Sequence, residues 1–442
     1  MSKGAIRTIM SKAAFYTLGC KVNQYETEAI SELFCKEGYE IVGYEEYADV
    51  YVINTCTVTA MSDRKSRQII RRAKKHNPNA IVVVTGCYAQ TNPEAVAEIE
   101  GVNLIVGTDD RKRIAELCKS ISPDEQRSCV GDIMKQHKFE DLTITECHDR
   151  TRAYIKIQEG CNQFCSYCII PYARGPIRSR DLEDVIRETK ILADNGYTEV
   201  IYTGIHVASF GLDTGKPLLA ELLCRADKID GIRRIRLSSI EPMTLNEEFI
   251  ESIKSCSKLC RHFHLSLQSG CDETLKRMNR KYTTEEYAKI AEGLRKHFPG
   301  AAITTDIMTG FPGETDEEFS ETLEFVKKIR FADAHIFQYS PRKGTPAAKR
   351  ADQIPPQIKE KRSKRLIELC GQTRDEFISS FKGKTVEVLF ERKKNGNIYE
   401  GKTSNYITVE VESEKPISGT YQNVIINKTE NGTAFGTVAE LN

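Results

Sequence analysis

Short apolar segments alternate with helical segments through the first 120 residues of the chain. The apolar segments have the length of single strands, and the segments between them, such as 24–35 and a basic one at 62–76, have helical patterns. Parallel strands need long crossover connections, which helices usually supply. The alternation therefore predicts βαβ units and a parallel α/β sheet in an N-terminal domain over residues 1–120. The candidate strands read AAFYTLG, VYVINT, IVVVTG and NLIVG.

Three of these strands end in a cysteine. Cys20 follows TLG, Cys56 follows INT and Cys87 follows VTG. In open α/β sheets the loops at the carboxyl ends of the strands form the ligand crevice. We therefore expect these three residues, called the sheet cysteines below, to converge in that crevice, although they lie far apart in the sequence.

A second α/β series follows a polar segment, 121–150, which we interpret as a linker. Six candidate strands alternate with helical segments, among them 182–195 and 283–298. Six strands with helices between them predict a partial (β/α)6 barrel over residues 151–350. The strands read AYIKIQ, EVIYTG, RIRLSS, HFHLSL, ITTDIMTG and HIFQYS.

The last part of the chain has a different pattern. Residues 351–382 contain two adjacent prolines and a charged helical segment, which predict a helical connector. From residue 383 to 442, short alternating segments are broken by Asn-Gly and other turn signals. This pattern predicts a small all-β barrel of a size that often binds nucleic acid.

Charge and cysteine content limit the kinds of function. The net charge is +1, so binding to nucleic acid would have to use local basic patches. The start of the chain lacks the apolar core of a signal peptide, and the longest apolar runs are strand-sized, so we expect a soluble cytoplasmic protein without a membrane span. An odd number of cysteines, fifteen, cannot all form disulfides, and metal ligation or free thiols are the better explanations.

The stretch GCNQFCSYC brings three more cysteines together directly after the first strand of the predicted barrel. Cys161, Cys165 and Cys168, called the loop cysteines below, have no further Cys or His close behind them. A structural zinc ion normally takes four protein ligands, whereas iron–sulfur clusters are held by cysteine thiolates. Three thiolates would leave one iron of a cubane cluster open to another ligand. A zinc site with a distant fourth ligand, or three unrelated buried thiols, are the alternatives.

The spacing of the loop cysteines, with Tyr167 before the last of them, resembles the signature of the radical S-adenosylmethionine superfamily. The resemblance implies that the open iron binds the amino and carboxylate groups of S-adenosylmethionine. It also implies that an electron from this [4Fe-4S] cluster breaks the sulfonium bond and releases a 5′-deoxyadenosyl radical.

The chain as a whole resembles the methylthiotransferases of that superfamily. The sheet cysteines match the cysteines that hold a second [4Fe-4S] cluster there, and the terminal β-module resembles their TRAM domain. The resemblance implies that one S-adenosylmethionine methylates a sulfur atom on the second cluster and that another starts the radical step, so both clusters must face one cavity. It also implies a tRNA substrate, an electron donor such as a flavodoxin or ferredoxin, and a monomer.

Branches of this family differ in substrate. The segments TLGCKVNQYETE, 17–28, and PYARGPIRSR, 171–180, resemble the branch that modifies threonylcarbamoyladenosine beside the anticodon of tRNA. The branch acting on isopentenyladenosine typically has Gln-Met-Asn where this chain has Lys21, Val22 and Asn23. That substrate, or an aspartate of a ribosomal protein, is the alternative. A non-catalytic RNA-binding metalloprotein and a two-cluster electron-transfer protein are alternatives from other classes.

Polar residues at the ends of barrel strands are candidates for contacts with S-adenosylmethionine, since barrel sites lie at the carboxyl ends of the strands. Ordinary capping and loop hydrogen bonds are the alternative. TGI replaces the Gly-Gly-Glu of many radical enzymes, which weakens the case for a carboxylate contact to the amino group. The candidates are Gly204, Ser238, Glu241, Ser266, Gln268 and Asp306.

Three arginines follow the loop cysteines, namely Arg174, Arg178 and Arg180. Planar guanidinium groups suit carboxylates and phosphates, so we expect these residues to bind substrate, with ordinary salt bridges as the alternative. The basic helix at 63–75 is another candidate for contact with tRNA phosphates or a solvated face.

Other cysteines and histidines imitate metal ligands. Cys256 and Cys260 are expected to share one side of a helix, and His262 and His264 one face of a strand, with packing as the favoured explanation. Cys147 and His148 receive the same interpretation. The remaining cysteines are predicted to be free thiols: Cys35, Cys118, Cys129, Cys224, Cys271 and Cys370.

Overall fold

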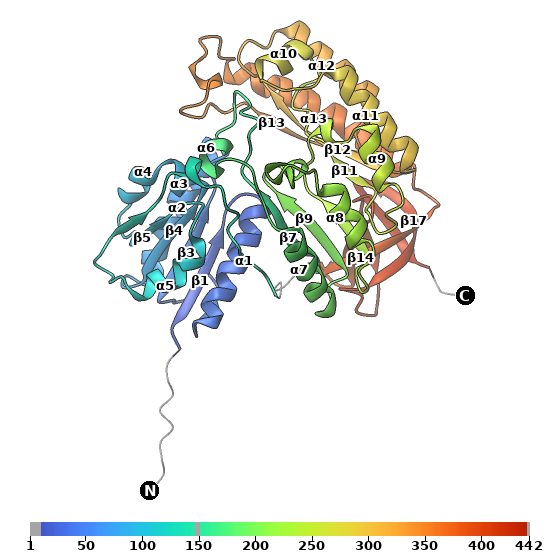
Figure 1. Cartoon of the computed structure of the whole chain (residues 1–442). Coiled ribbons are helices and arrows are strands. Elements are labelled where there is room, and N and C mark those ends of the chain that lie inside the picture. The colour runs from blue at the N-terminus through green and yellow to red at the C-terminus, as the bar shows by residue number, and fades with distance from the viewer. Residues whose placement is uncertain (1–9, 146–150, 440–442) are drawn as a thin grey trace. The chain divides into compact units, whose positions relative to one another are not determined.

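The computed structural model describes residues 10–145 and 151–439, and the chain forms two compact units (Figure 1). Unit 1 contains the residues up to 145 together with Gln158–Asn162 and Cys168–Arg180. Unit 2 contains the intervening residues 151–157 and Gln163–Tyr167, and all described residues from Asp181 onward. The loop cysteines are therefore divided between the units, with Cys165 in unit 2 and the other two in unit 1.

Unit 1 is built on a six-stranded parallel sheet with the order β2-β1-β3-β4-β5-β6. This confirms the predicted parallel α/β sheet. The bounds are β1 Lys12–Thr17, β2 Glu40–Val42, β3 Val50–Thr55, β4 Ile81–Gly86, β5 Leu104–Val106 and β6 Arg127–Cys129. The helices are α1 Lys21–Lys36, α2 Ala60–His76, α3 Cys87–Thr91, α4 Pro93–Ala97 and α5 Ile114–Lys119.

Both faces of this sheet are buried, which explains why its central strands are almost entirely apolar. Successive side chains of a strand point to opposite faces. In β3, Val50 and Val52 belong to one apolar cluster, whereas Tyr51 and Ile53 belong to another. Strands covered on both faces read as continuous apolar runs, and the sequence has such runs at β3 and β4.

The sheet extends further than the sequence indicates. The predicted linker at 121–150 contains β6, which pairs with β5, and residues 121–145 belong to unit 1. Both β6 and the other unpredicted strand, β2, are three residues long and partly exposed. Such short edge strands have no apolar run to reveal them.

Unit 2 begins with six strands, as predicted. Two sheets, β10-β9-β7 and β11-β12-β13, are joined by isolated bridges such as Ile235 to Leu259 and Ile240 to Leu265. A two-residue strand, β8 Arg178–Ser179 of unit 1, pairs antiparallel with the last residues of β7. The six strands are β7 Ala153–Glu159, β9 Glu199–Gly204, β10 Arg234–Leu237, β11 His262–His264, β12 Ala302–Thr309 and β13 Asp333–Gln338.

Helices connect these strands, which confirms the partial (β/α)6 barrel. In Figure 1 α11 and α12 lie on the outer side of β12. The bounds are α6 Ile170–Arg174 in unit 1, then α7 Leu182–Asp194, α8 Leu219–Ala226, α9 Glu247–Ile253, α10 Asp272–Arg277, α11 Thr284–His297 and α12 Asp316–Ile329. None of the helices within 10–145 and 151–439 combines the length and apolar character needed to cross a membrane.

A long helix, α13 Pro356–Ser379, leads to a closed five-stranded barrel with the order β14-β15-β16-β18-β17. The predicted small all-β barrel is confirmed. Its fifth strand, which follows Asn431 and Gly432, was not predicted because its sequence, TAFGTV, is short and weakly apolar. The strands are β14 Thr385–Lys393, β15 Ile398–Thr403, β16 Thr408–Glu412, β17 Tyr421–Glu430 and β18 Thr433–Val438.

Within unit 2 the small barrel contacts the amino ends of the partial-barrel strands. Tyr406 stacks on His262 with ring centroids 4.7 Å apart, and the Arg236 guanidinium lies 4.7 Å from the Tyr406 ring centroid. Arg236 Nε also lies 3.0 Å from Oε1 of Glu199, which is fully buried. Aromatic stacking and a cation–π contact thus join the two parts of unit 2, and the Glu199 carboxylate balances the buried charge of Arg236.

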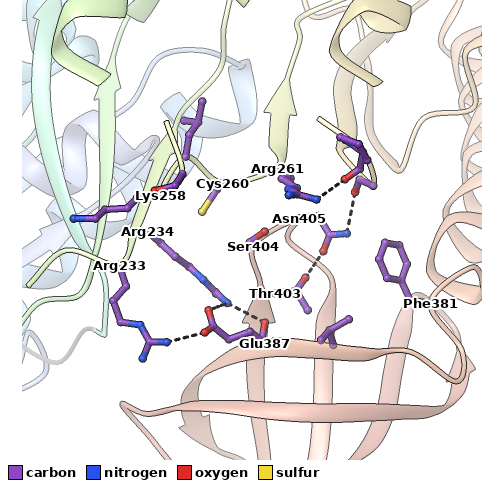
Figure 2. Close-up of a pocket in the computed structure, with 15 residues that line it drawn as sticks. Arg233, Arg234, Lys258, Cys260, Arg261, Phe381, Glu387, Thr403, Ser404 and Asn405 are labelled. Atoms are coloured by element: carbon purple, nitrogen blue, oxygen red, sulfur yellow. Dashed lines mark hydrogen bonds and ion pairs between the residues drawn. The ribbon is translucent and has the colours of Figure 1, made fainter. Parts of the chain in front are cut away.

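A cavity of about 360 Å³ lies beside this junction. Figure 2 shows Arg233 and Arg234 reaching Glu387, at 2.7 Å and 3.0 Å between nitrogen and oxygen, and Asn405 donating to the Gly300 carbonyl over 3.2 Å. The partial-barrel residues around the cavity precede β10, β11 and β12. Since barrel enzymes work at the opposite, carboxyl ends of their strands, this cavity is not the expected catalytic site.

Replacing Tyr406 by leucine is expected to lower the free energy of unfolding of unit 2 by about 1–2 kcal/mol, because stacking and cation–π contacts are lost. Urea denaturation followed by tyrosine fluorescence measures the change. The control is Tyr47→Leu, since the Tyr47 side chain in unit 1 is 60% exposed and should contribute little. Equal effects of the two substitutions would contradict the importance of the Tyr406 contacts.

Candidate metal and cofactor sites

The sheet cysteines gather at one edge of the unit 1 sheet. β1, β3 and β4 are adjacent and parallel, so their carboxyl ends lie together, and a sheet cysteine follows each within a few residues. Gly19 lies so close to Cys56 that a Cβ added to it would be 2.9 Å from Cys56 Cβ and 3.0 Å from Cys56 Sγ. The approach of Gly19, next to Cys20, to Cys56 agrees with the predicted convergence.

The sheet cysteines also affect one another's pKa. Burial raises the pKa of all three thiols, and neighbouring thiols raise it further: Cys56 acts on Cys20, Cys87 on Cys56, and Cys20 on Cys87. The Arg174 guanidinium acts in the opposite direction on each thiol. Positive charge is what thiolate ligands at a partly buried site require, and here Cys56 and Cys87 are buried whereas Cys20 is exposed.

Arg174, the last residue of α6, is the source of this charge. It is fully buried, and its Nε lies 3.1 Å from Cys87 Sγ. Its other nitrogens donate to Glu26 over 2.6 Å, to Asn23 over 2.5 Å and to Glu159 over 3.1 Å. The structure therefore gives Arg174 a partner that the sequence did not indicate, and the substrate contact predicted for it stays a prediction.

Arg178 and Arg180 are also buried in unit 1. Arg178 Nη2 donates to the Arg174 carbonyl over 2.9 Å, and Arg180 Nη1 lies 3.4 Å from the Tyr25 hydroxyl. Burial lowers the pKa of Arg178, with the charges of Arg111 and Arg174 acting in the same direction. For these two residues as well, contact with substrate stays a prediction.

The loop that carries the loop cysteines is held through its backbone groups by hydrogen bonds within each unit. In unit 1 the Cys161 N–H donates to the Gly175 carbonyl over 3.0 Å. In unit 2 the Ser166 N–H donates to the Met278 carbonyl over 2.9 Å, and Asn279 Nδ2 donates to the Phe164 carbonyl over 3.0 Å. The loop is thus shaped by the protein itself.

Arg280, which contacts a loop cysteine, was not among the residues predicted from the sequence. Its Nη1 lies 3.3 Å from Cys165 Sγ, and its Nη2 lies 2.7 Å from Glu241 Oε2 and 3.3 Å from the Ser266 carbonyl oxygen. One guanidinium therefore joins a cluster-ligand candidate to two of the predicted cofactor residues. In the sequence it is one cation within RMNRKY, which carries no signal for such a role.

Glu241 is held as a carboxylate at this place. Burial alone would raise its pKa, but the nearby His206 and Arg280 outweigh burial and lower the pKa below its usual range. His206 Nε2 lies 3.8 Å from Glu241 Oε2, two residues beyond Gly204 at the end of β9. A buried carboxylate beside cations can fix the position of an amino or hydroxyl group of a ligand.

Two buried polar atoms near these groups have no hydrogen-bond partner among the described residues, namely Ser238 Oγ and Gln268 Oε1. Both residues are more than nine-tenths buried, and the Gln268 backbone has φ +69°. Buried polar atoms are normally satisfied, so such atoms at a strand end are available to a ligand. This agrees with a polar cofactor such as S-adenosylmethionine.

Asp306 is linked to this region through the backbone, since its carbonyl accepts the Gln268 N–H over 2.9 Å. Its carboxylate faces His264 Nε2 at 3.1 Å and His335 Nδ1 at 3.5 Å. Burial opposes ionisation of this carboxyl, but the two histidines outweigh it and lower the pKa. A contact of Asp306 with a cofactor stays a prediction.

The other cysteines and histidines whose spacing is similar to that of metal ligands make different contacts in the structure. The expectation that Cys256 and Cys260 share a helix is wrong, because α9 ends at Ile253, and Cys256 Sγ lies 3.5 Å from Cys224 Sγ. His262 and His264 both contact the Thr304 hydroxyl, at 2.9 Å and 3.0 Å. Cys147 and His148 lie outside the described residues.

Within residues 10–145 and 151–439, no group of three or more His, Cys, Asp and Glu side chains is already arranged to hold a metal ion. The sheet cysteines are no exception to this finding, and all three are free thiols. Their chemistry, their shared edge and the adjacent guanidinium fit an iron–sulfur cluster, which is built onto such thiols rather than bound as a single ion.

Replacing Arg280 by glutamine is expected to reduce S-adenosylmethionine cleavage by about 10–100-fold, the usual effect of losing a group that orients a metal ligand. Reductive cleavage followed by chromatography measures it. The matched control is Arg277→Gln, because Arg277 lies three residues before Arg280 but pairs with Glu318 of α12, at 2.5 Å. A loss of the same size in both variants would contradict a specific role of Arg280.

Two family models match parts of this chain. Residues 155–326 match the Radical SAM superfamily, and residues 12–107 match the Uncharacterized protein family UPF0004. Among solved structures, the radical S-adenosylmethionine methyltransferase TsrM from Kitasatospora setae has a TM-score of 0.56 at 17% identity, over 77% of each chain. That similarity shows the fold alone.

Curated relatives cover almost the whole chain. The threonylcarbamoyladenosine tRNA methylthiotransferase MtaB of Bacillus subtilis is 45% identical over 95% of this chain and 94% of that protein. The protein of the same name from Aquifex aeolicus is 42% identical over 92% and 98%. A tRNA-2-methylthio-N(6)-dimethylallyladenosine synthase of Acetivibrio thermocellus is 36% identical over 96% and 90%. Similarity of this extent shows that the chain belongs to the radical S-adenosylmethionine methylthiotransferase family.

Proposed function

We propose that this protein attaches a methylthio group to carbon 2 of threonylcarbamoyladenosine next to the anticodon in tRNA. The observation that carries the proposal is the gathering of the sheet cysteines at one sheet edge, because a radical enzyme that only cleaves S-adenosylmethionine has no need of a second set of sulfur ligands. The relatives at 45% and 42% identity bear the name of this activity.

The loop cysteines would hold a [4Fe-4S] cluster with one open iron for S-adenosylmethionine. When bound, these groups supply one-electron chemistry that removes a hydrogen from an aromatic carbon, which no side chain achieves by proton transfer. Arg280 would fix the position of the Cys165 sulfur relative to the Glu241 carboxylate. The unsatisfied Ser238 Oγ and Gln268 Oε1 would bind polar groups of the cofactor.

The sheet cysteines would hold a second [4Fe-4S] cluster, which would supply the sulfur of the methylthio group. Burial at the sheet edge shields Cys56 and Cys87 from water, whereas Cys20 is exposed. Arg174 compensates part of the negative charge of three thiolates. The residues therefore supply position, charge balance and exclusion of water.

The protein's partners follow from this function. The tRNA would bind through basic surface residues and the closed C-terminal barrel, a size of module that often binds nucleic acid. We expect Arg174, Arg178 and Arg180 to contact the substrate if binding of tRNA exposes these buried side chains. A flavodoxin or ferredoxin would supply electrons to a monomeric enzyme in the cytoplasm.

Mass spectrometry of tRNA nucleosides from cells lacking this protein tests the substrate. Threonylcarbamoyladenosine should lose its methylthio group while isopentenyladenosine keeps it. Loss only from isopentenyladenosine would move this chain to the branch represented by the relative with 36% identity. Retention of both modifications, together with protein that binds zinc in place of about eight irons, would support a non-catalytic RNA-binding protein.

A further inference from the structure

We infer that Arg174 is a positioning residue for the second cluster, which it holds through a hydrogen bond to the sulfur of Cys87. We further infer that Arg174 and the next residue, Gly175, together fix the position of this sulfur relative to the loop cysteines. The inference rests on the proposed function, because it concerns the cluster that the sheet cysteines hold there. The sequence motif around Arg174 does not separate this role from a contact with substrate.

The contact between Arg174 and Cys87 is direct and buried. Arg174 Nε lies 3.1 Å from Cys87 Sγ, and the two residues are 0% and 3% exposed. A buried guanidinium is costly unless partners surround it, and a thiolate sulfur is a charged partner. Arg174 Nε is therefore placed to compensate negative charge on Cys87 Sγ.

Carboxylates and an amide fix the rest of the guanidinium. Nη1 of Arg174 lies 2.6 Å from Glu26 Oε1 and 3.1 Å from Glu159 Oε1, and Nη2 lies 2.5 Å from Asn23 Oδ1. Arg111 is a second cation at the same carboxylates, 2.5 Å from Glu26 and 3.4 Å from Glu159. Because these contacts engage both terminal nitrogens, the direction of Nε is set by the protein before any cluster is present.

Arg174 also begins a short connection to the loop cysteines. The next residue, Gly175, accepts the backbone N–H of Cys161 over 3.0 Å. Gly175 has φ +70°, and a Cβ added there would strike the carbonyl oxygen of Ile133. Two adjacent residues therefore bond to one member of each cysteine set, the first through its side chain and the second through its carbonyl.

A hydrogen bond to a ligand sulfur has two measurable effects. It stabilises the reduced, more negative form of a cluster and so raises the reduction potential. It also orients the ligand, so that its loss alters the geometry of the cluster. Both effects are visible in the cluster itself, independently of tRNA modification.

The test uses the full chain with all three loop cysteines changed to alanine, so that iron binds only at the sheet cysteines. Arg174→Gln, Arg174→Lys and Arg111→Gln are each added to this parent. Iron content, the electron paramagnetic resonance spectrum of the reduced cluster and its midpoint potential are measured after reconstitution, and circular dichroism checks the fold. Arg111→Gln is the matched control, since it removes a neighbouring charge without touching sulfur.

Arg174→Gln should make the midpoint potential more negative than Arg111→Gln does and should change the spectrum. Arg174→Lys, which keeps the charge but not the planar fork, should fall between Arg174→Gln and the parent. If Arg174→Gln fails to fold, a potential and spectrum of Arg174→Lys equal to those of the parent would overturn the inference. So would shifts in Arg174→Gln no larger than those in Arg111→Gln. A parent that binds no iron would instead overturn the proposed second cluster, and the inference with it.

Discussion

Replacing Cys87 by alanine is expected to abolish methylthiolation of tRNA while S-adenosylmethionine is still cleaved under reduction, whereas Cys165→Ala should abolish both reactions. The reason is that the two substitutions remove ligands of different clusters. Activity should fall below detection in each case, because a cluster with only two protein ligands is not retained. Nucleoside mass spectrometry measures the first reaction, and chromatography of cleavage products measures the second.

Iron content provides the control for this pair of variants. Each should keep about four irons, since one cluster remains. Cys118→Ala is the matched control, because Cys118 is a buried thiol in α5 away from the sheet edge, and burial raises its pKa to about 12. It should keep about eight irons and both reactions. Complete methylthiolation by Cys87→Ala would refute the assignment of the second cluster.

Replacing Gly160 by alanine should destabilise unit 1 by about 2–5 kcal/mol. Gly160 has φ +74°, a conformation that costs an L-residue about 1–2 kcal/mol. An added Cβ would also strike the Pro176 carbonyl oxygen and lie 2.6 Å from the Gly175 carbonyl oxygen. Backbone atoms give way less easily than side chains, and overpacking typically costs a further 1–3 kcal/mol or so. Chemical denaturation of the full chain measures the free energy of unfolding.

The matched control for this prediction is Gly38→Ala. Gly38 has a similar φ of +86° in the same unit, but nothing lies within 4 Å of an added Cβ. The control should therefore show only the cost of the backbone conformation, about 1–2 kcal/mol. If both glycines gave the same value, the crowding between Gly160 and Pro176 would be refuted.

Much of the architecture was readable from the sequence because burial leaves a local pattern. The apolar runs of β3 and β4 lie in a sheet covered on both faces, and the alternating segments after residue 383 form a closed barrel. The edge strands β2 and β6 were missed since their pairing depends on neighbours rather than on their own residues.

The residues of the two sites could be predicted from the sequence only in part, because some of them are brought together by contacts between distant segments. Cysteine spacing is a local property, so the loop cysteines were evident in one stretch of sequence. Arg280 reaches Cys165 across 115 residues, and Arg174 reaches Cys87 across 87. Such contacts form only in the tertiary structure. An arginine in a charged segment has the same sequence neighbours whether its side chain faces solvent or contacts a sulfur atom.

The placement of the sheet cysteines has a consequence for biogenesis. Each thiol arrives on a different crossover connection, so these ligands meet only after three parallel strands have paired. Non-local pairing of this kind is slow to form. Loading of iron at this place would therefore require that this sheet has already formed, whereas Cys161, Cys165 and Cys168 lie within one stretch of eight residues and need no strand pairing to come near one another.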